Sequence, residues 1–189
     1  MRLVGVGLAG LYLLVDSHWD ASPLVGSAML LSGTTLACIA VILRAWAMLY
    51  IAGYKTERLI MEGPFSVCRN PIYFSTVIGV LGIALDTCTF TMPLLVLLLY
   101  LPYINTQINA EEEKLAARHG ARFEAYRRRV PRLIPNFALL DEPDEYAVQP
   151  ARFRRWLADG LWFVWGIGAV EMIDALHDAQ VIPTLCLLY

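Results

Sequence analysis

Two short polar strings, each beside an apolar segment, carry side chains that could bind a charged ligand. The first is Arg69-Asn70-Pro71. Asparagine is a preferred N-cap and proline is favoured at the first helical position, so this string predicts a helix that begins at Pro71. A helix start presents unpaired N–H groups and a partial positive charge, and Arg69 beside it adds a cation, which suits a carboxylate or phosphate. The same string also fits a transmembrane helix that is simply capped.

The second string is Glu111-Glu112-Glu113. Successive helical residues point about 100° apart, so the three glutamates cannot all face one ligand, although one or two can turn inward. Carboxylates near a bilayer interface can hold a cationic or hydroxyl-bearing ligand under a low local dielectric. The alternative interpretation is a solvated helical face that also carries Lys114 and Arg118.

Cations outside these strings allow two further interpretations. Arg44 stands inside an apolar segment, where an ionisable group is by default a functional hypothesis, although it could also snorkel or act as a structural partner. We treat it as a candidate substrate-binding residue. A basic cluster, interleaved with Phe123 and Tyr126, is expected to face lipid headgroups, at about 1 kcal/mol per cation near an anionic leaflet, and not nucleic acid. Its members are Arg122, Arg127, Arg128, Arg129 and Arg132.

Metal chemistry is not expected. The four cysteines and three histidines show no ligand spacing, so neither a zinc site nor a disulfide framework is predicted. Four residues could share one helix end and bind a metal, but a polar helix end explains them more simply. They are Glu171, Asp174, His177 and Asp178.

The elements that must position these residues are membrane helices. Of the 189 residues, 58% are hydrophobic and 17% charged, against about a quarter charged in soluble domains. One crossing takes roughly 20 residues, so four or five crossings would use most of the chain. The expected all-α fold is a single membrane domain, 1–189, with five spans near residues 2–19, 24–52, 71–85, 92–104 and 156–173.

The distribution of cations predicts the orientation of these spans. With five crossings and the N-terminus inside, every basic loop falls on the cytoplasmic side, and only Arg44 does not. The charged segment 105–135, expected to be helical with a break at Gly120, then lies on the same side as the start of the 71–85 helix. Both candidate strings are therefore predicted at the cytoplasmic face.

Taken in order, several motifs resemble the integral-membrane methyltransferases typified by isoprenylcysteine carboxyl methyltransferase, with the phospholipid N-methyltransferases as relatives. The resemblance covers about 43–135, a methyltransferase-like core, and leaves 151–189 as an additional helix and tail. It is carried by Leu43-Arg44-Ala45-Trp46-Ala47, Gly63-Pro64-Phe65, Arg69-Asn70-Pro71-Ile72-Tyr73, Glu111-Glu112, Gly120, Tyr126 and Val130-Pro131-Arg132-Leu133-Ile134-Pro135.

This resemblance implies a function and a set of site residues. It implies S-adenosylmethionine bound on the cytoplasmic side and a lipid that enters sideways from the bilayer. Pro71, Tyr73, Glu111, Glu112 and Tyr126 would line or support the cofactor pocket together with Arg69 and Asn70, and Glu112 would be nearest the reacting centre.

Two positions differ from the family pattern. Asn70 replaces a histidine and cannot accept a proton near neutral pH, and Asn109 replaces an arginine, so a prenylcysteine carboxylate would meet one cation fewer. Asn70 and Asn109 join Glu112 as candidate catalytic residues.

The sequence thus predicts an S-adenosylmethionine-dependent O- or N-methyltransferase in the membrane. Its acceptor is a prenylcysteine carboxylate, a phenolic lipid or an amine headgroup. The alternative is a non-catalytic membrane scaffold or small carrier whose basic cytoplasmic helix binds partners or anionic lipid.

Overall fold

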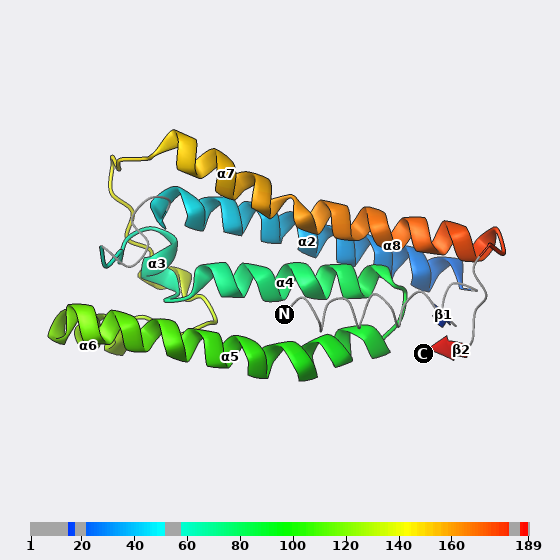
Figure 1. The fold of residues 1–189 in the computed structure, drawn as a ribbon, viewed down its shortest axis with the longest axis horizontal. Helices are drawn as coiled ribbons and strands as arrows, with labels where there is room; N and C mark the ends of the chain where they lie inside the picture. Colours follow the sequence, from blue (N-terminus) through cyan, green and yellow to red (C-terminus); the bar gives the residue numbers. More distant parts are fainter. Residues whose placement is uncertain (1–14, 18–21, 52–57, 182–185, 189) are drawn as a thin grey trace. The chain divides into compact units, whose positions relative to one another are not determined.

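The computed structural model describes residues 15–17, 22–51, 58–181 and 186–188. These residues form helices, as the sequence predicts, apart from two three-residue strands, and Figure 1 shows their order. The longer helices are α2 (Pro23–Ile51), α4 (Pro71–Asp86), α5 (Thr91–His119) and α8 (Trp162–Asp178). The shorter ones are α3 (Pro64–Val67), α6 (Ala121–Arg129), the 3₁₀ helix η2 (Phe137–Leu139) and α7 (Pro150–Gly160). Strands β1 (Val15–Ser17) and β2 (Cys186–Leu188) pair in parallel.

Two helices in the described part of the chain, α2 and α5, are long and apolar enough to cross a membrane. Each has 29 residues, or about 44 Å at 1.5 Å per residue, which exceeds the roughly 30 Å hydrocarbon core. Helix α4 is a shorter apolar helix of 16 residues. The first predicted span falls largely on 1–14 and 18–21, outside the described residues, and five crossings stay a prediction.

The helix boundaries agree with the sequence signals in most places. Helix α4 begins at Pro71, α5 continues through the charged segment to His119, and the predicted break at Gly120 is confirmed. The predicted single helix over 156–173 is wrong, because α7 ends at Gly160 and α8 begins at Trp162. The N–H of Leu161 donates to the carbonyl of Ala158, three residues earlier, at 3.2 Å. This 3₁₀-type hydrogen bond ends α7.

The chain forms two compact units. The first, the glycine-packed unit, comprises Met1–Cys38, Gly79–Leu98 and Phe163–Tyr189. In its described part, a Cβ on Gly82 would lie 2.6 Å from the carbonyl oxygen of Gly33 and 2.9 Å from the nitrogen of Ala37. Only small residues allow α2 and α4 to approach this closely, which is the usual packing of membrane helices.

The second, the polar unit, comprises Ile39–Ile78 and Leu99–Trp162. One apolar cluster packs Leu59 against Phe123, Tyr126 and Val130, so α6 is fixed to the segment before α3. The turn before α3 depends on Gly63, whose φ of 57° is unfavourable for other residues. A Cβ there would also lie 2.3 Å from the ring of Tyr50.

Candidate functional site

The site begins with the backbone between α3 and α4, which is held in place by the segment 131–136. The N–H of Arg69 donates to the carbonyl of Pro131 at 2.9 Å, and the N–H of Asn136 donates to the carbonyl of Val67 at 2.9 Å. The buried Cys68 thiol donates to the carbonyl of Leu133 at 3.0 Å. This pairing fixes Arg69 at the start of α4.

The Arg69 guanidinium joins α5 to the end of α6. Its Nε donates to Glu112 Oε1 at 3.0 Å, and its Nη1 donates to the carbonyls of Arg127 and Val130 at 2.8 and 2.7 Å. The cation therefore satisfies carbonyls at a helix C-terminus, where the helix dipole favours positive charge. The side chains of Arg69 and Glu112 are only 9% and 14% exposed, so this ion pair is largely shielded from water.

Asn70 occupies the predicted N-cap position of α4. The helix begins at Pro71, and the carbonyl of Asn70 accepts from the N–H of Phe74 at 3.1 Å. Its side-chain nitrogen donates to Glu112 Oε1 at 3.1 Å and to the carbonyl of Arg132 at 3.0 Å. The residue before Pro71 thus contacts the central carboxylate through an amide.

Glu112 is the centre of this arrangement. Its Oε1 accepts from Arg69 and Asn70, and Arg132 Nε lies 3.9 Å from the same oxygen. Arg132 also donates to Asn109 through Nη2. The start of α4 and the acidic part of α5 therefore meet, as the sequence interpretation requires.

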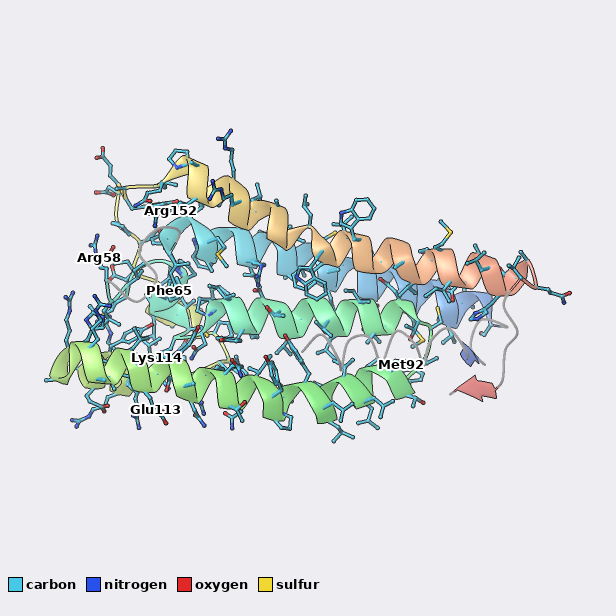
Figure 2. All side chains as sticks on the ribbon, in the orientation of Figure 1. Arg58, Phe65, Met92, Glu113, Lys114 and Arg152 are labelled. Carbon is cyan, nitrogen blue, oxygen red and sulfur yellow. The ribbon has the colours of Figure 1, made fainter. Side chains whose placement is uncertain are left out.

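The adjacent glutamate Glu111 has a different neighbour, because it interacts electrostatically with Tyr73 on α4. Figure 2 shows side chains leaving this part of α5 in different directions, as at the labelled Glu113 and Lys114. This agrees with the expectation that the three adjacent glutamates cannot all face one ligand. Two carboxylates of α5 consequently interact with separate residues at the start of α4.

A cavity of about 320 Å³ opens beside Glu112. Three arginines and two glutamates contribute to its wall, so positive and negative groups are offered together. The residues that line it are Arg69, Asn109, Glu112, Glu113, Ala116, Arg127 and Arg132. A ligand that bears both a carboxylate and an ammonium group would find a partner for each.

Two predicted cofactor residues, Pro71 and Tyr126, are buried and are not among the residues that line the cavity. The Tyr126 hydroxyl donates to the carbonyl of Phe65 at 2.8 Å, which ties α6 to α3, and Figure 2 labels Phe65 there. Burial raises the pKa of Tyr126, and burial likewise raises the pKa of Cys68 to about 11. Both groups therefore stay neutral at physiological pH.

Arg44, the candidate substrate-binding residue, is not among the residues that line the cavity. Its Nη1 donates to Thr76 Oγ1 on α4 at 3.1 Å. Arg44 therefore lies in the polar unit. Its partner Thr76 lies on α4, six residues after Asn70.

Several residues of the site were missed or interpreted differently from the sequence. Arg127 and Arg132 were assigned to a headgroup-facing cluster, yet both line the cavity, and Arg132 reaches Glu112. The charge pattern indicates a basic helix, but it does not reveal which cation turns inward. In the same cluster Arg122, Arg128 and Arg129 are exposed, which agrees with the surface interpretation.

The acidic linker also has an unexpected contact. Glu142 Oε1 accepts from Trp46 Nε1 at 3.2 Å and from the Tyr50 hydroxyl at 2.9 Å. The ring of Tyr146 stacks on Tyr50 with centroids 4.3 Å apart, and the N–H of Gly63 donates to the carbonyl of Asp141 at 2.7 Å. This linker secures α3 against the end of α2, and no local sequence pattern signals a contact over so long a separation.

Comparison with known proteins extends this description. A family model described as phospholipid methyltransferase matches residues 22–122. The nickel-cobalt-cadmium resistance protein NccN of Alcaligenes xylosoxydans xylosoxydans is 31% identical over 173 residues, which cover 92% of this chain and 78% of the relative. The cobalt-zinc-cadmium resistance protein CzcN of Cupriavidus metallidurans is 32% identical over 170 residues, covering 88% and 76%. No solved structure matches the chain.

Proposed function

The chain belongs to the phospholipid methyltransferase family, and from that premise we propose that it transfers a methyl group from S-adenosylmethionine to a lipid-like acceptor in the membrane. The family supports methyltransferase activity in general. The identity of the cofactor, the identity of the acceptor and the roles of the site residues belong to the proposal.

The observation that carries this proposal is the meeting of α4 and α5 around Glu112, beside a cavity with both signs of charge. The methionyl part of the cofactor carries a carboxylate and an ammonium group, which match the arginines and glutamates of the wall. In addition, Arg132 Nε is buried and, in the described structure, makes no hydrogen bond. Its ion pair with Glu112 Oε1, at 3.9 Å, is too long for a hydrogen bond, so a ligand carboxylate would supply the hydrogen bond that this donor lacks.

The protein contributes by positioning the methyl donor and the acceptor and by excluding water from the site. S-adenosylmethionine supplies, when bound, a methyl group on a sulfonium: the acceptor's lone pair forms the new bond, the carbon–sulfur bond breaks, and its electron pair stays on sulfur. Arg69 and Asn70 hold Glu112 in one orientation through hydrogen bonds to its Oε1. Holding the reactants in line in a dry site supplies much of the rate enhancement in such displacements.

The acceptor must offer an available lone pair. Asn70 cannot take a proton near neutral pH, and Glu112 Oε1 is already shared between Arg69 and Asn70. This favours an acceptor that arrives as an ionised oxygen or as a neutral amine, which includes a prenylcysteine carboxylate, a phenolic lipid and an amine headgroup. After attack by an amine, the extra proton leaves from nitrogen to water.

We further propose that the site faces the cytoplasm, with the N-terminus on the same side. The basic loops support this orientation through the positive-inside rule. Helix α5 carries the link between membrane and site, because its first half is apolar and its second half bears Glu111 and Glu112.

The relatives' names raise metal binding as another function. Among the residues that the structure describes, no group of three or more His, Cys, Asp or Glu side chains could hold a metal ion. No feature of these residues therefore favours direct metal binding as a second candidate, and methyl transfer remains the function proposed.

The experiment is transfer of labelled methyl from S-adenosylmethionine to extracted membrane lipid by the purified protein in detergent. We expect lipid-soluble label with the wild type and with Arg154→Ala, an exposed α7 control, and at least a tenfold loss with Glu112→Gln. Label confined to water-soluble product would contradict a lipid acceptor. No transfer by the wild type would favour the scaffold alternative.

A further inference from the structure

One residue that lines the cavity, Arg132, is held at both ends by asparagines. At its backbone, Asn70 donates through Nδ2 to the carbonyl of Arg132 at 3.0 Å. At its side chain, Arg132 Nη2 donates to the Oδ1 of Asn109 and, at 3.4 Å, to the carbonyl of Asn105. Asn70 directly precedes α4, and Asn109 lies on α5. Contacts with two helices of the polar unit therefore determine where this guanidinium lies.

The segment that carries Arg132 explains why these contacts matter. Arg132 follows α6, which ends at Arg129, and it lies in a stretch that is neither helix nor strand. The preceding residue is a proline, which has no N–H to donate, and the carbonyl of Pro131 accepts from the N–H of Arg69 at 2.9 Å. Since no regular element directs the Arg132 side chain, its orientation depends on its hydrogen bonds to α5.

The other two arginines of the cavity are already paired with carboxylates. Arg69 Nε lies 3.0 Å from Glu112 Oε1, and Arg127 Nη1 lies 3.4 Å from Glu124 Oε1. Arg132 Nε lies 3.9 Å from Glu112 Oε1, an oxygen that already accepts from Arg69. This Nε is buried and makes no hydrogen bond to the described residues. Of the three arginines, Arg132 therefore has a buried donor left to bind a ligand.

The cavity lies along one face of α5. The α5 residues that line it are Asn109, Glu112, Glu113 and Ala116. They are spaced by three and four positions, which places them on one side of a helix. Asn109 thus holds the Arg132 guanidinium at the cavity wall, and Glu113, labelled in Figure 2, lies one turn further along the same face. A guanidinium that is held in this way binds a carboxylate through charge-assisted hydrogen bonds.

We propose that Asn109 is a positioning residue that acts through Arg132, and that Arg132 binds the carboxylate of the methionyl group of the methyl donor. This inference rests on the proposed function and adds the orientation of the cofactor to it: the carboxylate lies at Arg132, and the ammonium group lies at Glu113. An amide suits the task of Asn109. It accepts a hydrogen bond from Arg132 without adding a negative charge, so the charge of the guanidinium stays available to the ligand.

The first test compares two ligands at equilibrium, without any acceptor. The purified chain in a neutral detergent is titrated with S-adenosylmethionine and with its decarboxylated form, which keeps the sulfonium and the ammonium group but lacks the carboxylate. We expect the wild type to bind S-adenosylmethionine at least tenfold more tightly than the decarboxylated form. Arg132→Gln should lose this preference, because it binds S-adenosylmethionine more weakly and the decarboxylated form about equally well.

The outcomes of this test separate the inference from the proposed function. A wild type that binds S-adenosylmethionine without preferring it to the decarboxylated form overturns the inference alone. An Arg132→Gln variant that keeps the preference does the same. No binding of S-adenosylmethionine by the wild type defeats the proposed function.

The second test changes the charge at position 109. Asn109→Asp keeps an acceptor for Arg132 Nη2 but adds a negative charge beside the ligand carboxylate. We expect this variant to bind S-adenosylmethionine at least tenfold more weakly and the decarboxylated form no more weakly, with a melting temperature that is unchanged or higher. Gln107→Glu is the matched control, because it adds the same charge at an exposed position of α5 that points about 200° away. It should bind both ligands like the wild type.

A merely structural role of Asn109 predicts a different result. Asn109→Asp would then bind S-adenosylmethionine like the wild type, since the hydrogen bond to Arg132 is kept, or it would weaken the binding of both ligands equally through a distorted cavity. Either result contradicts the proposal. Asn109→Leu removes the acceptor without adding a charge, and we expect it to weaken the binding of S-adenosylmethionine but not of the decarboxylated form.

Discussion

The two compact units of this chain are stabilised by different kinds of contact. In the glycine-packed unit, helices approach so closely that a Cβ on Gly79 would lie 2.2 Å from the Phe163 ring, and one on Gly82 would lie 2.6 Å from the carbonyl of Gly33. In the polar unit, the central contacts are the ion pair of Arg69 with Glu112 and the carbonyls around it. The first unit is held together by close packing at glycines, and the second by an ion pair that is largely shielded from water.

This difference separates a supporting region from a chemical one. Buried ion pairs contribute little net stability compared with apolar packing, because desolvation offsets the attraction between the charges. Stability therefore does not explain the ion pair in the polar unit, since the other unit is held together by close packing at glycines. Ligand binding at the cavity beside Glu112 is the reason proposed here.

The largest expected effect is in the polar unit. Arg69→Ala removes one partner of a largely buried pair and should lower the free energy of unfolding by about 3 kcal/mol or more, because Glu112 is left without its main cation. Thermal or denaturant unfolding in detergent measures it. The control is Glu124→Gln, which removes the exposed pair with Arg127 and should cost less than about 1 kcal/mol. Similar losses for both variants would remove the distinction between the buried and exposed pairs.

The next effect tests the glycine-packed unit. Gly82→Leu should destabilise by about 1–3 kcal/mol, because backbone atoms of α2 occupy the space that its side chain needs. Gly168→Ala is the matched control, since a Cβ there meets nothing within 4 Å, and it should be neutral or slightly stabilising. If Gly82→Leu unfolds like the wild type, close helix approach is not what holds this unit together.

The pH dependence of stability tests the interior of the polar unit. Burial raises the pKa of Cys68 from its ordinary 9.0 to about 11, so the native state holds the thiol proton more tightly than the unfolded chain. This contribution is complete below pH 9 and is lost as the pH rises to about 11, on the order of 2–3 kcal/mol in all. Unfolding of wild type and Cys68→Ala between pH 8 and 11 should converge. Curves that stay parallel would contradict a buried neutral thiol.

Much of the fold could be predicted from local signals. The Asn70-Pro71 string marks the start of α4, and Gly120 marks the break between α5 and α6, because caps and breaks depend on neighbouring residues. The meeting of Arg69 with Glu112 follows only from tertiary structure. Its partners at Arg127 and Val130 are backbone carbonyls, which every residue has and no sequence pattern marks.

Other parts of the site needed the structure for similar reasons. Arg128 is exposed on α6, whereas Arg132 follows the end of α6 and its side chain reaches Glu112. Composition cannot distinguish these two arginines. Glu142 contacts Trp46 and Tyr50 across a long separation in the sequence. The division of α7 from α8 was missed because Gly160 within an apolar run is tolerated in many membrane helices.

The smallest expected effect is at the contact between α6 and α3. Tyr126→Phe removes the hydrogen bond to the carbonyl of Phe65 and should destabilise by about 1 kcal/mol, because a buried acceptor loses its partner. Tyr146→Phe alters an exposed residue and should change stability by less than about 0.5 kcal/mol. Equal melting temperatures for the two variants would show that the Tyr126 hydroxyl does not tie α6 to α3.

The central claim is that the start of α4 and the acidic part of α5 bind S-adenosylmethionine together. Equilibrium binding of labelled S-adenosylmethionine to purified wild type, Glu112→Gln and Arg154→Ala tests it without any acceptor. We expect saturable binding to the wild type and to Arg154→Ala, and at least tenfold weaker binding to Glu112→Gln, which still melts cooperatively. Wild-type protein that shows no saturable binding, or a Glu112→Gln variant that binds equally well, would contradict this account.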